Sequence, residues 1–129
     1  MEEFNNLKIL LVEDNWINQR LATLTFKQLG VAIDLASNGQ EALEMSRKNN
    51  YDLILMDLQM PVMDGLESAR QIRAFEHETG NVHRACIVAL TANVNPEIKA
   101  ECAQAGLDDF MEKPFEADDL RTLLSKKFN

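Results

Sequence analysis

The chain has 129 residues, of which 46% are hydrophobic and 26% are charged, and it carries a net charge of −8. This composition is typical of a soluble globular protein, and the length favours one domain over residues 1–129. The negative charge argues against a nucleic-acid-binding domain, and no apolar stretch approaches the roughly 20 residues that a membrane-spanning helix requires.

Five short apolar runs along the chain are predicted to form β-strands. They are LKILLV (7–12), VAIDLA (31–36), YDLILM (51–56), CIVALT (86–91) and DFMEK (109–113). The first, third and fourth runs are nearly continuous in Leu, Ile and Val, which is typical of strands covered on both faces. The second run carries a charge at Asp34, which indicates a strand at the edge of a sheet.

A helix is predicted after each of these strands. Asn15 is the expected cap of a first helix whose Ile17, Leu21 and Leu24 share one face and which Gly30 ends. The later helices have their own signals, which are the cap pairs Asn38–Glu41 and Asp64–Glu67, the start Asn95-Pro96-Glu97 with its stop Gly106, and the apolar stripe Leu120, Leu123, Leu124 and Phe128. A long polar connection, FEHETGNVHR (75–84), is expected before the fourth strand.

The alternation of strand and helix, five times over, predicts an α/β fold. Its core is expected to be a doubly wound, five-stranded parallel sheet with helices on both faces. The two cysteines, Cys86 and Cys102, lack the spacing of a metal or redox site, so we expect free thiols in a reducing cytoplasm.

Charged and polar residues stand at the ends of four predicted strands. Glu13 and Asp14 follow the first strand, Asp57 follows the third, Thr91 ends the fourth and Lys113 ends the fifth. Because ligands of open parallel sheets bind at the carboxyl ends of the strands, we expect these five residues to meet at one edge. Each residue alone also has a structural explanation, such as a helix N-terminus for the acidic pair or a solvated strand end for Asp57.

The expected cluster has a definite chemistry. Three neighbouring carboxylates repel one another, so such a site either raises a pKa or binds a cation. Their oxygen atoms suit Mg²⁺, which prefers hard ligands in octahedral coordination. An aspartate can attack phosphorus and form an acyl phosphate, while an ammonium and a hydroxyl stabilise the phosphoryl oxygens. The residues therefore predict a carboxylate site that handles a phosphoryl group.

Four segments of the chain, ILLVEDNWINQRL, ILMDLQMPVMDGLE, IVALTAN and MEKPF, resemble the receiver domain of two-component response regulators. The similarity extends over essentially the whole chain, and the segments keep the order and spacing of the family. The resemblance implies the flavodoxin-like receiver fold, with the strand order 2-1-3-4-5 taken from the family. The segments VEDNWINQ and ALTAN, together with the 75–84 connection, are most similar to receivers of hybrid sensor histidine kinases.

The resemblance implies a role for each residue of the expected site. Asp57 matches the phosphoacceptor, and Mg²⁺ (or Mn²⁺) would be bound by Asp14, Asp57 and the backbone carbonyl of Gln59, with Glu13 acting through water. Thr91 matches the hydroxyl that senses the phosphoryl group, and Lys113 matches the ammonium that pairs with it. The remaining matches are the switch aromatic Phe110, the lifetime-tuning positions Gln59 and Asn93, and the cis peptide Lys113–Pro114. Apart from the resemblance, Pro61 is expected to restrict the backbone of Met60.

This family would move a phosphoryl group from a phosphohistidine to Asp57 with Mg²⁺. Phosphorylation is then expected to alter the face formed by the fourth helix, fifth strand and fifth helix. The implied partners are a sensor histidine kinase, a histidine phosphotransfer protein, and a second copy bound through that face. The domain itself is expected to be a phosphoacceptor rather than a conventional enzyme. We expect it in the cytoplasm with no membrane contact of its own, as part of a hybrid kinase that could be anchored in a membrane.

Other functions fit part of this pattern. The chain could be a stand-alone single-domain response regulator, or a metal-dependent phosphohydrolase with an aspartyl phosphate intermediate. A flavodoxin-like cofactor binder would need a donor-rich loop after the first strand, where this chain has EDN. A degenerate receiver that acts by contact alone is disfavoured by the five intact site residues.

Overall fold

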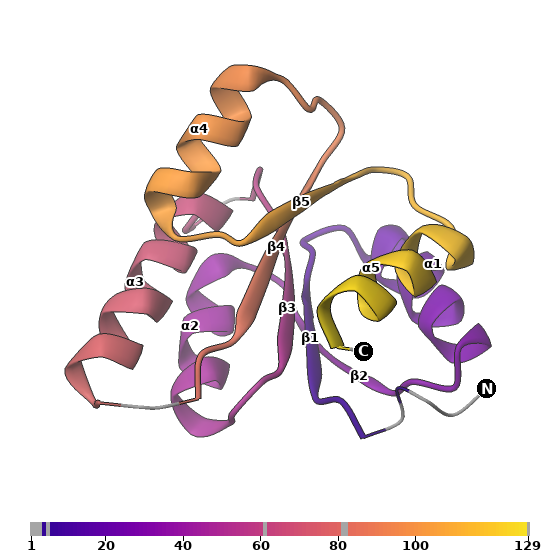
Figure 1. Ribbon diagram of the computed structural model, residues 1–129, viewed down its shortest axis with the longest axis horizontal. Helices are drawn as coiled ribbons and strands as arrows, with labels where there is room; N and C mark the ends of the chain where they lie inside the picture. Colours follow the sequence, from indigo (N-terminus) through magenta and orange to yellow (C-terminus); the bar gives the residue numbers. More distant parts are fainter. Residues whose placement is uncertain (1–3, 5, 61, 81–82, 129) are drawn as a thin grey trace.

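Strands and helices alternate along the computed structural model, which describes residues 4, 6–60, 62–80 and 83–128 (Figure 1). The elements are β1 (Ile9–Val12), α1 (Trp16–Gln28), β2 (Ile33–Ala36), α2 (Gly39–Lys48), β3 (Leu53–Asp57), α3 (Gly65–Glu78), β4 (Cys86–Thr91), α4 (Pro96–Ala105), β5 (Asp109–Glu112) and α5 (Ala117–Phe128). Each predicted strand and helix is present, so the α/β fold class expected from the sequence is confirmed.

The strands form one parallel sheet in the order β2-β1-β3-β4-β5, which is the order that the resemblance implied. Leu11 of β1 lies opposite Leu35 of β2 on one side and Leu55 of β3 on the other. Asp57, the last residue of β3, lies opposite Leu90 of β4. The edge position of β2 agrees with the charge at Asp34. Because all strands run in the same direction, their carboxyl ends share one edge of the sheet.

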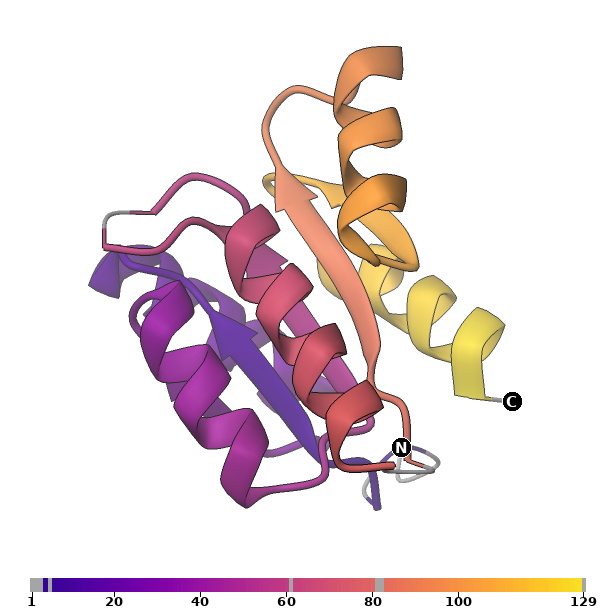
Figure 2. The same cartoon turned by 90° about the vertical axis from the view of Figure 1, so that its left-hand side faces the viewer.

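Helices cover both faces of the sheet and bury two separate hydrophobic cores. Figures 1 and 2 show α2, α3 and α4 over one face, with α1 and α5 behind the other. Adjacent residues of β1 serve different cores, since Leu10 packs beneath α2 and α3 while Leu11 packs beneath α1 and α5. This burial on both faces explains why the central strands are continuous apolar runs.

Polar side chains cap four helices where the sequence predicted caps. Asn15, Asn38, Asp64 and Asn95 each accept a hydrogen bond of 2.8 to 3.0 Å from the backbone N–H three residues later. Each bond satisfies a donor that the first helical turn leaves without a partner. The stop signal of α4 is also confirmed, because Gly106 follows it with a φ of 92°, a conformation that glycine adopts at no steric cost.

The predicted apolar face of α1 forms, but it faces solvent. Ile17, Leu21 and Leu24 are 52%, 59% and 53% exposed, whereas Ala22 and Phe26 are the buried residues of the helix. Neighbouring Trp16 is 68% exposed. An apolar stripe at helical spacing normally marks the side of a helix that faces the core. This helix instead leaves a row of apolar side chains on the surface of the molecule.

The long connection expected at 75–84 is shorter than predicted. Its first four residues belong to α3, which continues to Glu78. The helix ends where the hydroxyl and the backbone N–H of Thr79 both donate to the carbonyl oxygen of Phe75. The polar residues of the last turn belong to a helix rather than a loop. The prediction of a loop, which was based on their polarity, is therefore wrong for these residues.

None of the helices in the described part of the chain combines the length and the hydrophobicity that crossing a bilayer would require.

Candidate functional site

Acidic side chains from two strand ends meet at the carboxyl edge of the sheet. Glu13 and Asp14 follow β1, and Asp57 ends β3, so that carboxylate oxygens of all three lie within 4.8 Å of one another. Glu13 and Asp57 are only 3% and 5% exposed, whereas Asp14 is exposed to solvent. The structure thus brings together the three carboxylates that the sequence expected at this edge.

Lys113 supplies the positive charge of the cluster. Its Nζ lies 3.3 Å from a carboxylate oxygen of Glu13 and 3.3 Å from a carboxylate oxygen of Asp57. The side chain is 25% exposed, so the ammonium is partly shielded from water on the cluster's side. The peptide bond between Lys113 and Pro114 is cis. One ammonium therefore balances part of the charge of three carboxylates.

The start of α1 fixes Glu13. The backbone N–H of Asn15 donates to a carboxylate oxygen of Glu13 at 3.1 Å, and the side-chain amide of Gln19 donates to its carbonyl at 2.6 Å. Burial raises the pKa of Glu13, the Asn15 hydrogen bond lowers it, and the charge of Asp57 raises it again; the net result is a raised pKa. Repulsion from the Asp57 carboxylate therefore contributes to the raised pKa of Glu13.

Backbone contacts fix Asp57 from both sides. The backbone N–H of Leu58 donates to the carbonyl of Leu90, and the backbone N–H of Gln59 donates to Oδ1 of Asp57 at 3.2 Å. On the helix side, a Cβ atom at Gly65 would collide with the carbonyl oxygen of Asp57. The first turn of α3 can approach the acceptor strand this closely because residue 65 is glycine.

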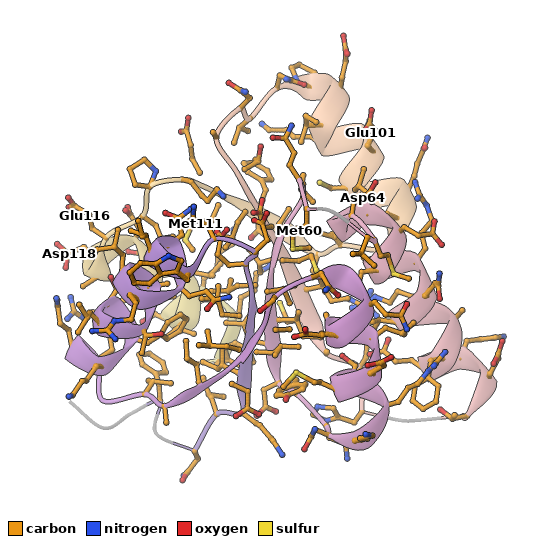
Figure 3. All side chains as sticks on the ribbon, turned by 180° about the vertical axis from the view of Figure 1, so that it is seen from behind. Met60, Asp64, Glu101, Met111, Glu116 and Asp118 are labelled. Carbon is orange, nitrogen blue, oxygen red and sulfur yellow. The ribbon has the colours of Figure 1, made fainter. Side chains whose placement is uncertain are left out.

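The loop between Asp57 and α3 lies at the same edge of the sheet. Figure 3 shows Met60 and Asp64 of this loop, and Asp64 caps α3 as predicted. Val62 is 83% exposed and has a φ of +70°, which is strained for a β-branched residue. Pro61, which we expected to restrict Met60, lies outside the described residues.

Thr91 stands beside the cluster at the end of β4, but its hydroxyl is engaged elsewhere. The Oγ1 atom accepts the backbone N–H of Asn93 at 3.1 Å and donates to the Asn93 carbonyl at 3.3 Å. The backbone of Thr91 accepts a hydrogen bond from the N–H of Lys113, which ties β4 to β5 at this end. The hydroxyl therefore ends β4 and the ammonium follows β5, on the adjacent strand, with the hydroxyl turned to the loop that enters α4.

Phe110 lies outside the acidic cluster. Its ring is partly buried against the core beneath α2, α3 and α4, and the Nζ of Lys99 lies 4.8 Å from the ring centroid. The ring of this expected switch residue of β5 is thus directed toward α4. No sequence signal predicted the contact with Lys99, because cation–π pairs have no fixed spacing along a chain.

A groove next to the cluster was not predicted from the sequence. It has a volume of about 600 Å³ and lies between α1 and the segment that follows β5. Its lining includes the charged Glu13 and Lys113 of the cluster and the apolar Leu21, Leu24 and Phe115. The exposed row of α1 therefore continues into a hollow that reaches the candidate site. The apolar spacing of α1 was visible in the sequence, but not that it faced outward.

Comparison with known proteins agrees with this geometry. Residues 9–125 match the family model described as the response regulator receiver domain. The chain is 40% identical to hybrid signal transduction histidine kinase K of Dictyostelium discoideum, over 92% of this chain and 10% of that protein. It therefore corresponds to a small part of this much longer relative.

Solved structures give the same result. The receiver domain of the sensor histidine kinase PA1611 from Pseudomonas aeruginosa, with a magnesium ion coordinated in its active site cleft, has a TM-score of 0.82 and 38% identity, covering 94% of this chain and 96% of that one. The receiver domain of the response regulator Ssk1 from Saccharomyces cerevisiae, crystallised with the histidine phosphotransfer protein Ypd1, has a TM-score of 0.86 and 35% identity, covering 94% and 88%. The chain therefore belongs to the family of response regulator receiver domains.

Proposed function

We propose that Asp57 of this receiver domain accepts a phosphoryl group from a phosphohistidine in a two-component phosphorelay. The observation that carries the proposal is the position of the Asp57 carboxylate. It is nearly buried at the end of β3, 3.3 Å from the ammonium of Lys113 and within 4.8 Å of carboxylate oxygens of Glu13 and Asp14. A nucleophile held in this way is fixed in place before its substrate arrives.

The donor atoms of the cluster fit a magnesium ion. Three carboxylates whose oxygens lie within 4.8 Å of one another are hard ligands, and one ammonium leaves them with excess negative charge. We propose that Asp14, Asp57 and the backbone carbonyl of Gln59 hold Mg²⁺, with Glu13 acting through water, and that Mn²⁺ can replace it. The bound ion supplies positive charge that offsets the charge of the carboxylates and the phosphoryl oxygens.

In the proposed reaction, a carboxylate oxygen of Asp57 forms a bond to phosphorus as the bond between phosphorus and the histidine nitrogen breaks. Lys113 pairs with the transferred phosphoryl group, and the hydroxyl of Thr91 leaves Asn93 to donate to a phosphoryl oxygen. Gln59 and Asn93 flank the acceptor and are proposed to tune the lifetime of the acyl phosphate. Movement of Thr91 and Phe110 would then alter the face formed by α4, β5 and α5, through which a second copy could bind.

The exposed row of α1 supports a protein as the phosphoryl donor. A phosphohistidine can reach Asp57 only if its carrier covers the surface beside the cluster, and that surface includes Ile17, Leu21, Leu24 and the groove beside them. Contiguous exposed apolar surface of this kind typically marks a site of protein interaction. The donor is proposed to be a histidine kinase or a histidine phosphotransfer protein. The Ssk1 receiver was crystallised with a protein of the second kind, Ypd1.

The relative from Dictyostelium supports a hybrid histidine kinase as the parent of this domain, with a stand-alone single-domain response regulator as the alternative. We propose a cytoplasmic location for the domain. The net charge of −8 supports an absence of nucleic acid among its partners.

Intact-mass measurement tests the proposed function. With Mg²⁺ and acetyl phosphate as a small phosphodonor, the protein should gain one phosphoryl group, and Asp57→Asn should gain none. Asp64→Asn is the matched control, because asparagine caps a helix as well as aspartate and the residue lies seven positions from the acceptor. Labelling of Asp57→Asn would overturn the assignment. Rapid turnover of unrelated phosphomonoesters would favour a phosphohydrolase instead.

A further inference from the structure

The two ends of α4 are held very differently. The buried residues of this helix are Cys102 and Ala105, both in its second half. Figure 1 shows the first half projecting beyond the carboxyl ends of the strands. Segments with few buried apolar contacts open at low free-energy cost, so the first half of α4 is the part most easily displaced.

Arg73 of α3 holds the C-terminal end of α4. The Nε of Arg73 donates to the carbonyl of Gly106 at 2.9 Å, and its Nη2 lies 2.7 Å from a carboxylate oxygen of Asp108. The same carboxylate accepts the backbone N–H of Ile87 at 2.9 Å. Because Arg73 is only 15% exposed, these charge-assisted bonds are poorly screened by water. They join the end of α4 to α3 and β4.

The first half of α4 has far fewer ties to the rest of the molecule. The Asn95 cap is internal to the helix, and Ile98 is only partly buried. Lys99 provides the polar contact, with its Nζ 4.8 Å from the centroid of the Phe110 ring on β5. Within the described part of the chain Lys99 forms no ion pair, so the ring is the partner of its ammonium.

The segment that leads into this half is held by Thr91. Its hydroxyl bonds both the N–H and the carbonyl of Asn93, two residues before the Asn95 cap. If that hydroxyl turns toward a phosphoryl group on Asp57, the loop loses both bonds. The apolar packing of Ile98 against the core and the contact between Lys99 and Phe110 then remain as attachments of the first half of α4.

We propose that Lys99 is a positioning residue of the switch. Its ammonium holds the Phe110 ring and the first half of α4 in the arrangement described here, and this contact opposes their rearrangement when Asp57 is phosphorylated. The inference rests on the proposed function and adds a residue that regulates it. Loss of the charge should therefore favour the rearranged state without any change at the acidic cluster.

Amide hydrogen exchange tests the resting arrangement without any phosphodonor. In Lys99→Met, which keeps a long unbranched side chain of similar helix propensity, amides of residues 99–102 should exchange about two- to fivefold faster. The amide of Leu107, which bonds the Cys102 carbonyl at the C-terminal end of α4, should not change. Lys48→Met, at an exposed lysine of α2, is the matched control and should leave α4 unaffected. Equal exchange in both variants would overturn the proposal.

Binding of beryllium fluoride, a mimic of a phosphoryl group on a carboxylate, tests the switch itself. In Mg²⁺ the affinity of Lys99→Met should be about two- to fivefold higher than that of the wild type. In a Phe110→Leu background, which removes the ring, the same substitution should have no effect. Equal affinities of wild type and Lys99→Met would overturn the role of Lys99 while leaving the proposed function intact. A wild-type protein that does not bind the mimic would count against the proposed function, and the exchange result would still decide the role of Lys99.

Discussion

Gly65 lies directly against the backbone of Asp57, so that a Cβ at position 65 would collide with the Asp57 carbonyl oxygen and lie 2.9 Å from the Cγ of Met56. Gly65→Ala should therefore displace either α3 or the end of β3. We expect a loss of about 1–3 kcal/mol in the free energy of unfolding, measured with denaturant. The rate of labelling by acetyl phosphate should fall up to about 100-fold, because the acceptor is displaced.

Gly80→Ala is the control for this substitution. Gly80 has a φ of +62°, and among the described residues other than its chain neighbours no atom lies within 4 Å of the added Cβ, so alanine should add backbone strain of about 1–2 kcal/mol without a collision there. We expect a comparable loss of stability with normal labelling. Reduced labelling in Gly80→Ala would mean that global destabilisation, not the position of Asp57, sets the rate.

Asp14→Asn should stabilise the metal-free protein and remove its response to Mg²⁺. Asp14 is the exposed member of a cluster of three carboxylates, so loss of its charge relieves repulsion. Mg²⁺ should raise the melting temperature of the wild type by preferential binding to the folded state and should leave the variant nearly unchanged. Glu101→Gln, at an exposed position of α4 (Figure 3), should behave like the wild type in calorimetry.

Val62→Asn should raise the free energy of unfolding by about 1 kcal/mol. Val62 is exposed with a φ of +70°, and asparagine adopts this conformation with less strain than a β-branched residue. Val62→Ile keeps the branch at Cβ and should give no gain in the same denaturant titration. A gain in both variants would show that the backbone strain is not the cause.

Leu21→Glu should impair transfer from a protein donor while sparing the site itself. Leu21 is 59% exposed on α1 and lines the groove, so the charge should not disturb folding. Labelling by acetyl phosphate is expected to stay normal, and transfer from a phosphorylated histidine phosphotransfer protein should fall at least about tenfold. Ala103→Glu adds the same charge at an exposed position of α4 and should transfer normally. Equal transfer by both variants would exclude α1 as the docking surface.

Asp109→Asn should destabilise the protein at neutral pH and not in acid. Burial alone would raise the pKa of Asp109, but the Phe110 backbone N–H and the ammoniums of Lys127 and Lys126 together lower it below its ordinary value. A lowered folded-state pKa stabilises the protein above the unfolded value of about 3.9, and the stabilisation is lost as the pH falls through the folded value. The difference from the wild type, about 1 kcal/mol at pH 7, should therefore shrink as the pH is lowered and vanish once Asp109 is protonated in the folded protein. Asp118→Asn, at a 92% exposed carboxylate, should show no such dependence in urea titrations.

The strands and the helix starts could be predicted from sequence because their causes are local. Leu10 and Leu11 are adjacent and both buried, as expected in a short apolar strand that is covered on both sides. The outward face of α1 could not be predicted in this way. Periodicity tells which residues share a face, whereas tertiary packing selected Ala22 and Phe26 for the core. The last turn of α3 was missed because its residues are polar, although Glu76 in this turn accepts a hydrogen bond from the backbone N–H of Ala85.

The same distinction applies to the candidate site. Parallel strands place their carboxyl ends on one edge, so Glu13, Asp57 and Lys113 could be assigned to one cluster from their positions alone. The direction of a hydroxyl or a ring is set by neighbours that are distant in sequence. For this reason the bonds from Thr91 to Asn93 and the contact of Lys99 with Phe110 had no counterpart in the sequence pattern.

The pairing of Lys113 with Glu13 joins residues that are 100 positions apart. During translation, the three carboxylates of the cluster are therefore synthesised well before Lys113. Until β5 has paired with β4, the carboxylates lack the counter-charge of Lys113. A nascent or truncated chain therefore has an incomplete binding site for a phosphoryl group. We expect phosphorylation to report two things at once, namely that the donor is active and that the receiver has finished folding.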